Sequence, residues 1–102
     1  MDRRMLVDLN TCKSTEIQKS GFTVGSEESM VDMYIFSPAV SRMHCRIISR
    51  EGQSYIVDLN SLNGTSVNGV RLSPNQEYPL TTKSVIRFAA VQYLYIEQKE
   101  GE

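Results

Sequence analysis

Short runs of alternating apolar and polar residues fill most of the chain, and glycine, proline or asparagine interrupts them at short intervals. An alternation of period two buries one face of a segment and exposes the other, as in a β-strand. No stretch of a dozen residues carries apolar positions at helical spacing without such an interruption. We therefore predict an all-β chain in which helix is limited to a short turn. The predicted strands cover residues 5–9, 15–19, 22–24, 33–36, 44–50, 53–59, 66–67, 70–72, 77–80, 84–88 and 92–97.

The composition supports this pattern. The chain has nine Val, seven Ile and six Thr but only three Ala, and β-branched residues favour pleated sheet over helix. About eleven short strands at this spacing are typical of a sandwich of two antiparallel sheets.

Two tight turns can be located from their residues. Asn68-Gly69 separates two short β runs, and an Asn-Gly pair readily adopts the positive φ angles of a type I′ hairpin turn. Glu51-Gly52 separates the two longest runs of the first half. We expect these two runs, 44–50 and 53–59, to form the most central pair of strands.

Length and charge narrow the possible functions. A chain of 102 residues makes one domain, with a core over about residues 5–96 and a frayed charged tail over 97–102. Eleven basic and twelve acidic residues give no global positive field, so we expect no nucleic-acid partner. No run is long and apolar enough for membrane insertion or a signal peptide, which predicts a cytoplasmic protein. The charged ends suggest a domain of a longer chain, and its oligomeric state is left open.

Metal and cofactor sites are not expected. Cys12, Cys45 and the single His44 are too few ligands for a closed zinc site in one monomer. The two cysteines are most simply interpreted as buried thiols in a reducing compartment, with a disulfide as the alternative. No phosphate-binding glycine-rich loop of the nucleotide-hydrolase type is present, and we expect no cofactor.

Function is expected in three loops, because polar groups in connections can face a partner. These are residues 25–30, 37–44 and 59–65. In the second loop Ser41 and Arg42 are adjacent, and a hydroxyl beside a guanidinium suits an oxyanion. Ser-Arg is also a common dipeptide of solvated loops. In the third loop Asn63-Gly64 is equally compatible with a simple turn before Thr65.

Together, these segments resemble a known family. Gly25 and Asp32 are followed by Ser41-Arg42-Met43-His44 and by the run from Asp58 to Gly69, which contains Asn60-Ser61-Leu62-Asn63-Gly64-Thr65-Ser66-Val67-Asn68-Gly69. In order and spacing they resemble the forkhead-associated (FHA) domain, in particular its bacterial members within longer signalling proteins. The resemblance covers about residues 5–96.

The resemblance implies a SMAD/FHA-like β-sandwich that recognises phosphothreonine in a partner's extended segment through loops at one end, without enzyme activity. By motif position, Ser41 would hydrogen-bond phosphate, Arg42 would add donors, Asn63 would hold the peptide backbone and Gly64 would let that backbone approach. The implied supporting residues of the motif are Gly25, His44, Asn68 and Gly69. The implied partner is a threonine-phosphorylated protein or peptide. The resemblance therefore also implies a role in signal transduction.

Two positions depart from the family pattern. Ser26 stands where the first loop usually carries an arginine that contacts phosphate, and acidic Glu27 and Glu28 follow it. Leu62 stands where many members have a threonine whose hydroxyl reaches phosphate. The loss of one charged and one neutral donor corresponds to about 2–4 kcal/mol, or 30- to 1,000-fold in affinity, if nothing compensates.

Three functional hypotheses follow. The first is phosphothreonine-dependent recognition, in which Ser26 and Leu62 would occupy phosphopeptide-contacting positions together with Ser41, Arg42, Asn63 and Gly64. The second is a phosphate-independent protein interaction or scaffold domain, suggested by Ser26 and Leu62 themselves. The third, an enzyme with Ser41 as nucleophile and His44 as base, lacks an identifiable orienting acid and an oxyanion motif.

Overall fold

The computed structural model describes residues 2–99, and this part of the chain is almost entirely β-structure. The strands are β1 (Arg3–Asp8), β2 (Ser14–Glu16), β3 (Phe22–Gly25), β4 (Met33–Tyr34), β5 (Cys45–Arg50), β6 (Gln53–Asp58), β7 (Thr65–Val67), β8 (Val70–Arg71), β9 (Glu77–Leu80), β10 (Ser84–Phe88) and β11 (Val91–Gln98). The only helical element within residues 2–99 is the short 3-10 turn η1 (Glu28–Met30). It is far too short to cross a bilayer, so no helix within the described residues could span a membrane.

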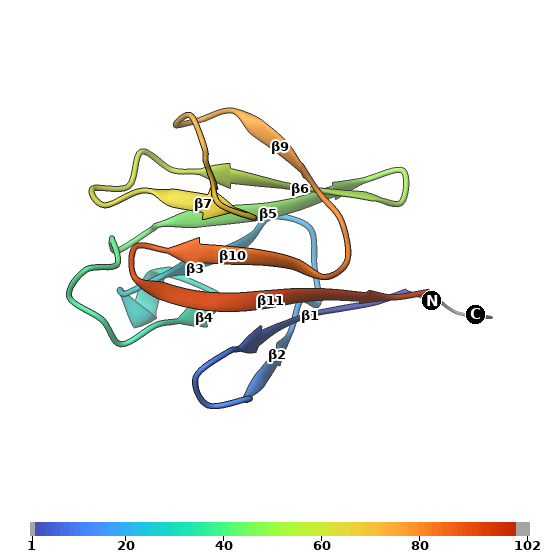
Figure 1. Cartoon of the computed structure of the whole chain (residues 1–102), viewed down its shortest axis with the longest axis horizontal. Coiled ribbons are helices and arrows are strands. Elements are labelled where there is room, and N and C mark those ends of the chain that lie inside the picture. Colours follow the sequence, from blue (N-terminus) through green and yellow to red (C-terminus); the bar gives the residue numbers. More distant parts are fainter. Residues whose placement is uncertain (1, 100–102) are drawn as a thin grey trace.

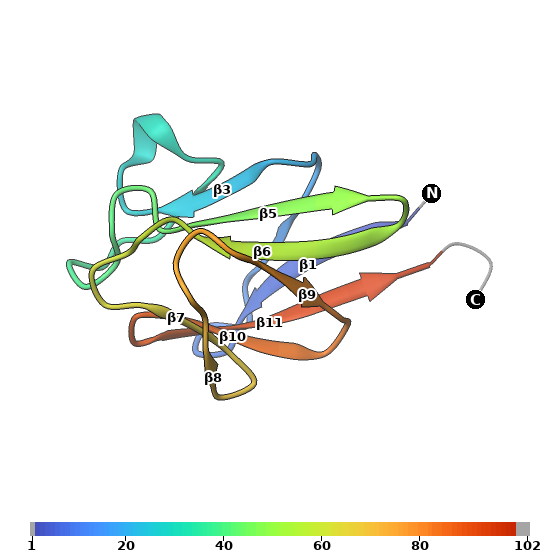
Figure 2. The ribbon, with the colours of Figure 1, turned by 90° about the horizontal axis from the view of Figure 1, so that it is seen from above.

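The strands form two sheets that face each other (Figures 1 and 2). One sheet has the order β2-β1-β11-β10-β7-β8, and the other has the order β4-β3-β5-β6-β9. The predicted two-sheet sandwich is therefore confirmed. One pairing departs from the antiparallel pattern, because β3 and β4 run parallel through Val24↔Met33 and Gly25↔Tyr34. The chain reaches this arrangement by leaving β3 through η1 and returning beside it.

Both predicted hairpin turns are present. Asn68 and Gly69 have φ angles of 50° and 84°, and they join β7 to β8. Glu51 and Gly52 have φ angles of 51° and 78°, and they join β5 to β6. The β5–β6 pair lies at the centre of the five-stranded sheet, as expected, with β3 beyond β5 and β9 beyond β6.

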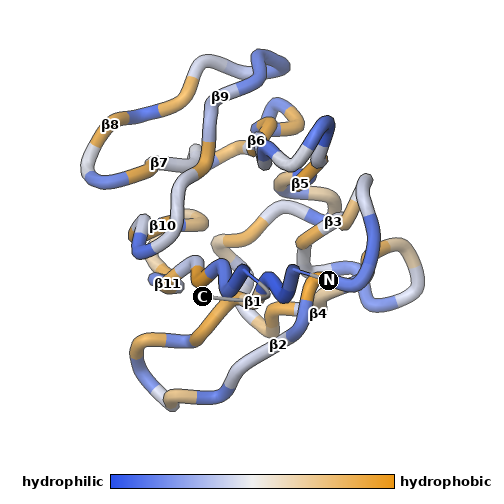
Figure 3. Tube along the Cα trace, turned by 90° about the vertical axis from the view of Figure 1, so that its right-hand side faces the viewer, coloured by the Kyte–Doolittle hydropathy of each residue, from blue (hydrophilic) through white to orange (hydrophobic). Residues whose placement is uncertain are grey.

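The core lies between the sheets and follows the alternation of the sequence. Seen from the end that carries the termini, hydrophobic and hydrophilic stretches alternate along the chain in both layers (Figure 3). In β5 and β6 every second residue is buried over much of the strand, which is the period expected when one sheet face packs on the other sheet. The largest fully buried hydrophobic side chains are Tyr95, Phe88, Leu6, Ile47, Ile56, Leu80 and Ile86.

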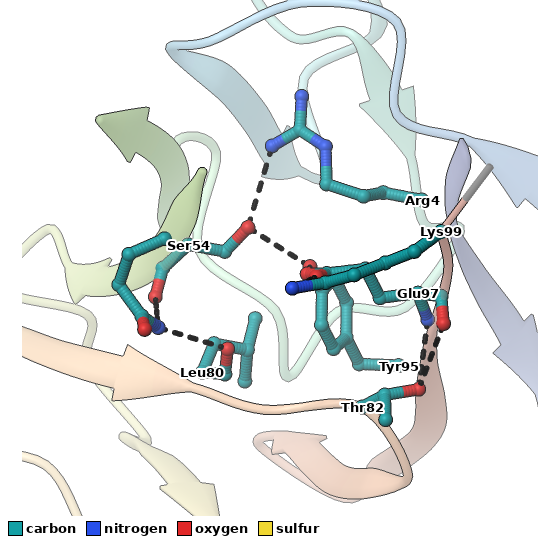
Figure 4. Close-up of polar contacts among 8 residues, drawn as sticks. Arg4, Ser54, Leu80, Thr82, Tyr95, Glu97 and Lys99 are labelled. Carbon is teal, nitrogen blue, oxygen red and sulfur yellow. Dashed lines mark hydrogen bonds and ion pairs between the residues drawn. The ribbon is translucent and has the colours of Figure 1, made fainter. Parts of the chain in front are cut away.

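A polar network joins the two sheets near the chain termini. The Tyr95 hydroxyl of β11 lies 2.9 Å from Ser54 Oγ of β6 and 2.7 Å from a carboxylate oxygen of Glu97 (Figure 4). Arg4 of β1 donates to the same Ser54 hydroxyl over 3.4 Å. Since Tyr95 and Ser54 are buried, these hydrogen bonds satisfy polar groups that the sandwich would otherwise leave without water.

The strand β11 is longer than expected at this end. Residues 97–102 were expected to form a frayed tail, but Glu97 and Gln98 pair with Arg4 and Arg3 of β1. The remainder of the predicted tail beyond Lys99 lies outside the described residues. The three loops singled out in the sequence lie at the opposite end of the sandwich, on the left in Figures 1 and 2.

Candidate functional site

The first two loops are joined by their backbones. Ser26 and Glu27 donate backbone N–H hydrogen bonds to the carbonyls of Ser41 and Arg42, over 3.0 and 3.3 Å. Gly25 makes this contact possible, because a Cβ at its position would lie 1.9 Å from the Arg42 carbonyl oxygen. A residue with a side chain cannot occupy that position without displacing the second loop. Gly25 therefore fixes where Ser41 and Arg42 sit.

The Ser26 side chain is also used inside this junction. Its hydroxyl donates to the backbone carbonyl of Val40 over 2.7 Å. The hydroxyl hydrogen of Ser26 is thus directed into the second loop. Where the family usually has an arginine, the first loop has Ser26, and its side chain stabilises the second loop.

His44 connects the second and third loops from below. Its Nδ1 accepts the backbone N–H of Ser41 over 3.0 Å, and its Nε2 lies 2.9 Å from the carbonyl oxygen of Gly64, to which it must donate. The side chain is fully buried, and its ring meets the ring of Phe88 edge-on at 5.9 Å. Burial lowers the pKa of His44, against the opposing effects of the Gly64 carbonyl and the Asp58 charge. The geometry thus requires the neutral imidazole with its hydrogen on Nε2.

The third loop is folded around the carboxylate of Asp58. Ser61 donates its hydroxyl to Oδ1 over 2.6 Å and its backbone N–H to Oδ2 over 3.0 Å, and Thr65 donates its hydroxyl to Oδ1 over 2.6 Å. Burial would raise the pKa of Asp58, but these donors outweigh burial and hold the pKa below its ordinary value. Ser61 Oγ in turn accepts the N–H of Gly64 over 3.0 Å, which sets the turn at Asn63 and Gly64.

Ser41 and Asn63 tie the third loop to the second. Ser41 Oγ accepts the backbone N–H of Leu62 over 3.0 Å, so that its own hydroxyl hydrogen is left to donate elsewhere. Asn63 donates from Nδ2 to the carbonyl of Ala39 over 2.8 Å. Both side chains that the sequence assigns to ligand binding therefore also hold the loops in register. Leu62 projects outward with 85% of its surface exposed.

The charges at this end are exposed and mixed. Arg42 is exposed, and its guanidinium makes no ion pair with another residue of the described chain. Glu27 and Glu28 lie in the adjacent first loop. An anion held at Ser41 would therefore be attracted by the exposed Arg42 and repelled by Glu27 and Glu28 of the neighbouring loop.

Of the predicted site residues, the structure brings Ser26, Ser41, Arg42, Leu62, Asn63 and Gly64 together at the junction of the three loops. Gly25 and His44 lie behind this junction. Asn68 and Gly69 lie in the β7–β8 turn, where the Asn68 side chain accepts the backbone N–H of Val85 over 2.8 Å and braces the hairpin against β10.

One cluster of potential metal ligands occurs among residues 2–99. The ligand atoms of His44, Cys45 and Asp58 lie within 4.8 Å of one another, and all three residues are buried. Each already has a partner: Cys45 Sγ lies 2.9 Å from Thr65 Oγ1, and burial strongly raises the pKa of its thiol. A thiol held protonated does not favour metal binding. Both cysteines are free thiols, but Cys12 is exposed rather than buried as predicted.

Sequence reasoning did not assign Asp58, Ser61 and Thr65 to the site, although they shape it. A signal for the first two exists, because an aspartate followed three residues later by serine is typical of a turn in which the side chain binds the backbone. No local signal marks Arg71, whose guanidinium lies so close to Gly64 that a Cβ there would be 2.4 Å from Arg71 Cζ.

Comparisons with known proteins place the chain in a family. The FHA domain family model matches residues 22–89. Among curated proteins, the chain is 27% identical over 92 residues to the Smad nuclear-interacting protein 1 of Mus musculus, covering 78% of this chain and 24% of that protein. It is 29% identical over 79 residues to the protein phosphatase 1 regulatory inhibitor subunit PPP1R8 homolog of Arabidopsis thaliana, covering 76% and 21%. The chain thus spans about a quarter of the length of these relatives.

Solved structures share the fold. The Mycobacterium tuberculosis protein EmbR in complex with a low affinity phosphopeptide superposes with a TM-score of 0.86 at 23% identity, covering 92% of this chain and 24% of that chain. The FHA domain of Chlamydia trachomatis CT664 has a TM-score of 0.86 at 24% identity, covering 95% and 99%. The N-terminal FHA domain of Saccharomyces cerevisiae Rad53p, in complex with a phosphothreonine peptide, has a TM-score of 0.85 at 14% identity, covering 94% of each chain.

These relatives include animal, plant, fungal and bacterial proteins, so the expected bacterial type stays a prediction. FHA domains are interaction modules rather than enzymes. The family model covers two thirds of the chain, and the two-sheet sandwich is the fold expected for this family. The chain belongs to the FHA domain family.

Proposed function

We propose that this chain recognises phosphothreonine in an extended segment of a partner protein, using the junction of its three loops. The observation that carries the proposal is the state of the Ser41 hydroxyl. Its oxygen accepts the Leu62 N–H, which orients the side chain and leaves its hydrogen for an external acceptor beside the exposed Arg42. A phosphothreonine carries about −1.5 to −2 charges at neutral pH, so that fixed donors at a shallow surface are enough to bind it.

The roles of the remaining residues follow from their contacts. Asn63 is held by the Ala39 carbonyl through Nδ2, and this leaves its Oδ1 for the backbone N–H of a bound segment. Gly64 has a φ of 85°, and the Arg71 guanidinium fills the space that a Cβ would occupy, so glycine is needed there to form the turn rather than to admit a ligand backbone. His44 acts as a positioning residue, since it is buried and holds Ser41 and Gly64 from behind. This arrangement is that of an interaction module, and we propose no catalytic role for Ser41 or His44.

Known structures of the family support the proposal. Similar structures include one from a study of phosphothreonine-dependent FHA domain interactions and one of a complex with a low affinity phosphopeptide. The departure at Ser26 weakens the expected binding, because its hydroxyl is used by Val40 and supplies no positive charge. We therefore expect weak affinity that depends on Arg42.

Peptide binding tests the proposal directly. A degenerate peptide library with central phosphothreonine is compared with the same library carrying threonine, by fluorescence polarisation with the full chain. We expect binding only with phosphate, weakened about 10-fold or more by Ser41→Ala and by Arg42→Gln. The matched controls are Ser73→Ala and Arg46→Gln, which remove an exposed hydroxyl and an exposed cation elsewhere. Equal binding of both libraries would overturn the proposal.

A second function is favoured by a specific observation. Phe36 and Leu62 expose 90% and 85% of their surfaces at the loop end, and exposed apolar side chains of this size are typical of protein interfaces. A phosphate-independent partner would tolerate Ser41→Ala but lose affinity with Leu62→Ser or Phe36→Ser. If phosphopeptides bind only after Ser26→Arg, this second function is the better description of the natural chain.

A further inference from the structure

Two arginines lie in one row across the outer face of the six-stranded sheet. Arg71 of β8 pairs with Ser66 of β7, and Ser66 pairs with Arg87 of β10. Arg71 and Arg87 are exposed and Ser66 is half-buried, whereas the flanking Thr65 and Val67 are buried in the core. The strand alternation therefore directs the three side chains of the row to the same, solvent-facing side of the sheet.

Within residues 2–99, the two guanidinium groups of this row have no acidic partner. Arg87 donates from Nε to the carbonyl of Ala89 over 3.0 Å, which leaves its terminal nitrogens to other acceptors. The Arg71 guanidinium lies against Gly64. Neither arginine forms an ion pair within residues 2–99, whereas Arg3 and Arg50 each pair with a glutamate. The two arginines lie two strands apart, about 10 Å between backbones, a spacing at which two long side chains can both reach an anion placed between them.

The row borders a shallow hollow that reaches the loop junction. The hollow has a volume of about 230 Å³ and is lined by Asn63 and Gly64 of the third loop together with Arg71, Arg87 and Ala89. No carboxylate contributes to its lining. It is therefore a positively charged surface continuous with the residues that we propose to bind phosphothreonine, although it lies on strands rather than on the loop tips.

We propose that Arg71, Ser66 and Arg87 form a second anion site, which takes a second acidic group of the bound segment. That group is a carboxylate or a phosphate monoester, since both have the planar or tripodal oxygens that guanidinium forks bind. Ser66 lies between the two arginines in the strand register, so its hydroxyl can donate to the same anion. The identity of the ligand rests on the proposed phosphothreonine function, but the anion site itself does not.

The first experiment tests the site without any peptide. Inorganic phosphate is titrated into the full chain while the arginine Nε–H signals are followed by two-dimensional ¹H–¹⁵N NMR. We expect saturable shifts of the Arg71 and Arg87 signals, and no saturable shift of Arg46, an exposed arginine of β5 in the other sheet. Only a small linear drift common to all arginines would overturn the anion site, whatever the outcome of the peptide experiments.

The second experiment identifies the source of the anion. The phosphothreonine peptide that binds best is varied one position at a time to serine, aspartate or phosphoserine over four residues on each side. We expect one position at which aspartate or phosphoserine improves affinity about 5- to 10-fold over serine, with the gain from phosphoserine being larger if the natural group is a second phosphate. If no phosphothreonine peptide binds, the primary function fails and the phosphate titration alone decides on the second site.

Charge-matched variants test whether Arg71 and Arg87 cause the gain in affinity from the second acidic group. Arg71→Gln and Arg87→Gln should each remove most of the gain from the second acidic group while leaving the dependence on phosphothreonine unchanged. Arg46→Gln changes the net charge equally and should keep the gain. Because Arg71 packs on Gly64, Arg71→Lys provides a milder change that keeps the positive charge but removes the two-pronged guanidinium. For this variant we expect a gain in affinity between those of the wild type and Arg71→Gln. A gain that is equal in all four variants, or absent in the wild type, overturns the proposal.

Discussion

The Cα of Gly25 faces the backbone carbonyl of Arg42 so closely that a methyl group there would lie 1.9 Å from the oxygen. Gly25 is at the end of β3, and Arg42 is in the loop before β5, so this contact fixes the second loop on the first. We predict that Gly25→Ala costs about 1–3 kcal/mol of unfolding free energy through overpacking, and abolishes phosphopeptide binding by displacing Ser41. Urea unfolding and fluorescence polarisation measure the two effects.

Gly52 provides the control for this prediction. It lies in the β5–β6 turn at the other end of the sandwich with a φ of 78°, and a Cβ there would contact nothing within 4 Å. Gly52→Ala should cost about 1 kcal/mol through backbone strain alone, with peptide affinity unchanged. If Gly25→Ala loses stability but binds peptide normally, the loop contact does not position the site.

The chain's single histidine should be neutral and carry its hydrogen on Nε2 at pH 7. Protonation of Nδ1 would direct an N–H at the Ser41 N–H that it now accepts. A long-range ¹H–¹⁵N spectrum reads this one ring without assignment. A charged ring, or a hydrogen on Nδ1, would contradict the hydrogen-bond pattern.

The same contact predicts a loss of stability in mild acid. Burial lowers the pKa of His44 below its ordinary value of 6.5, so the unfolded chain takes up a proton before the folded chain does. Stability is therefore fully present above pH 6.5 and is lost as the pH falls through the lower, folded-state pKa. The lowered pKa of Asp58 acts only below its ordinary value of 3.8, in a separate window. Urea midpoints between pH 7.5 and 5 should fall, and a flat profile would contradict the prediction.

Much of the fold could be predicted because its information is local. Asn68-Gly69 and Glu51-Gly52 specify hairpins by turn chemistry, and the alternation in β5 and β6 specifies which residues face the core. The parallel β3–β4 pairing could not be predicted in this way. β4 has only two residues, and its position depends on the path of the loop around η1, which Asp32 ties back to the Thr23 backbone N–H over 2.9 Å.

Thr65 offers a test of how the third loop is held. Its hydroxyl donates to the buried Asp58 carboxylate over 2.6 Å. Thr65→Val is nearly isosteric and removes this donor, so we expect a loss of about 1.5–3 kcal/mol in unfolding free energy. It should also raise the pKa of Asp58, and acid unfolding should then begin at a higher pH. Urea unfolding at pH 7 and acid titration by circular dichroism measure both effects.

A surface pair of the same chemistry is the control. The Thr23 hydroxyl donates to the exposed Asp32 carboxylate over 3.1 Å. Thr23→Val should cost less than about 1 kcal/mol, because water replaces the lost donor. Equal costs for the two variants would show that burial of Asp58 does not determine the strength of its hydrogen bonds.

The sequence motifs located the candidate loops but did not show how these loops are held together. The order of Ser41, His44 and Asn63 in the sequence identified the loops, because each motif is contiguous. The contacts from Ser26 to Val40 and from Arg71 to Gly64 were not predictable, since each joins different segments whose approach is set by the packed sandwich. The hydrogen bond from the Ser26 hydroxyl to Val40 matters most here. It shows that the residue in place of the usual arginine stabilises the second loop.

Tyr95 should contribute to stability at the end of the sandwich remote from the loops. Its buried hydroxyl hydrogen-bonds Ser54 of the other sheet and Glu97. Tyr95→Phe keeps the ring but leaves the buried Ser54 hydroxyl with only the longer hydrogen bond from Arg4. We therefore expect the free energy of unfolding to fall by about 1–2 kcal/mol at pH 7, and peptide affinity to stay unchanged. Urea unfolding measures the loss, and Tyr78→Phe at a partly buried core edge is the control, with an expected change below about 0.5 kcal/mol.

The pH dependence distinguishes this network from simple packing. Burial raises the pKa of Tyr95 well above its ordinary value of 10.0, so its contribution is fully present below pH 10 and is lost as the pH rises through the folded-state pKa. The wild type should therefore lose stability between pH 9 and pH 11, and Tyr95→Phe should lose less. Part of the fall remains in the variant, because burial also raises the pKa of Tyr93 and of the Cys45 thiol. Parallel profiles for the two proteins would mean that the Tyr95 hydroxyl is not held in its neutral form by the fold.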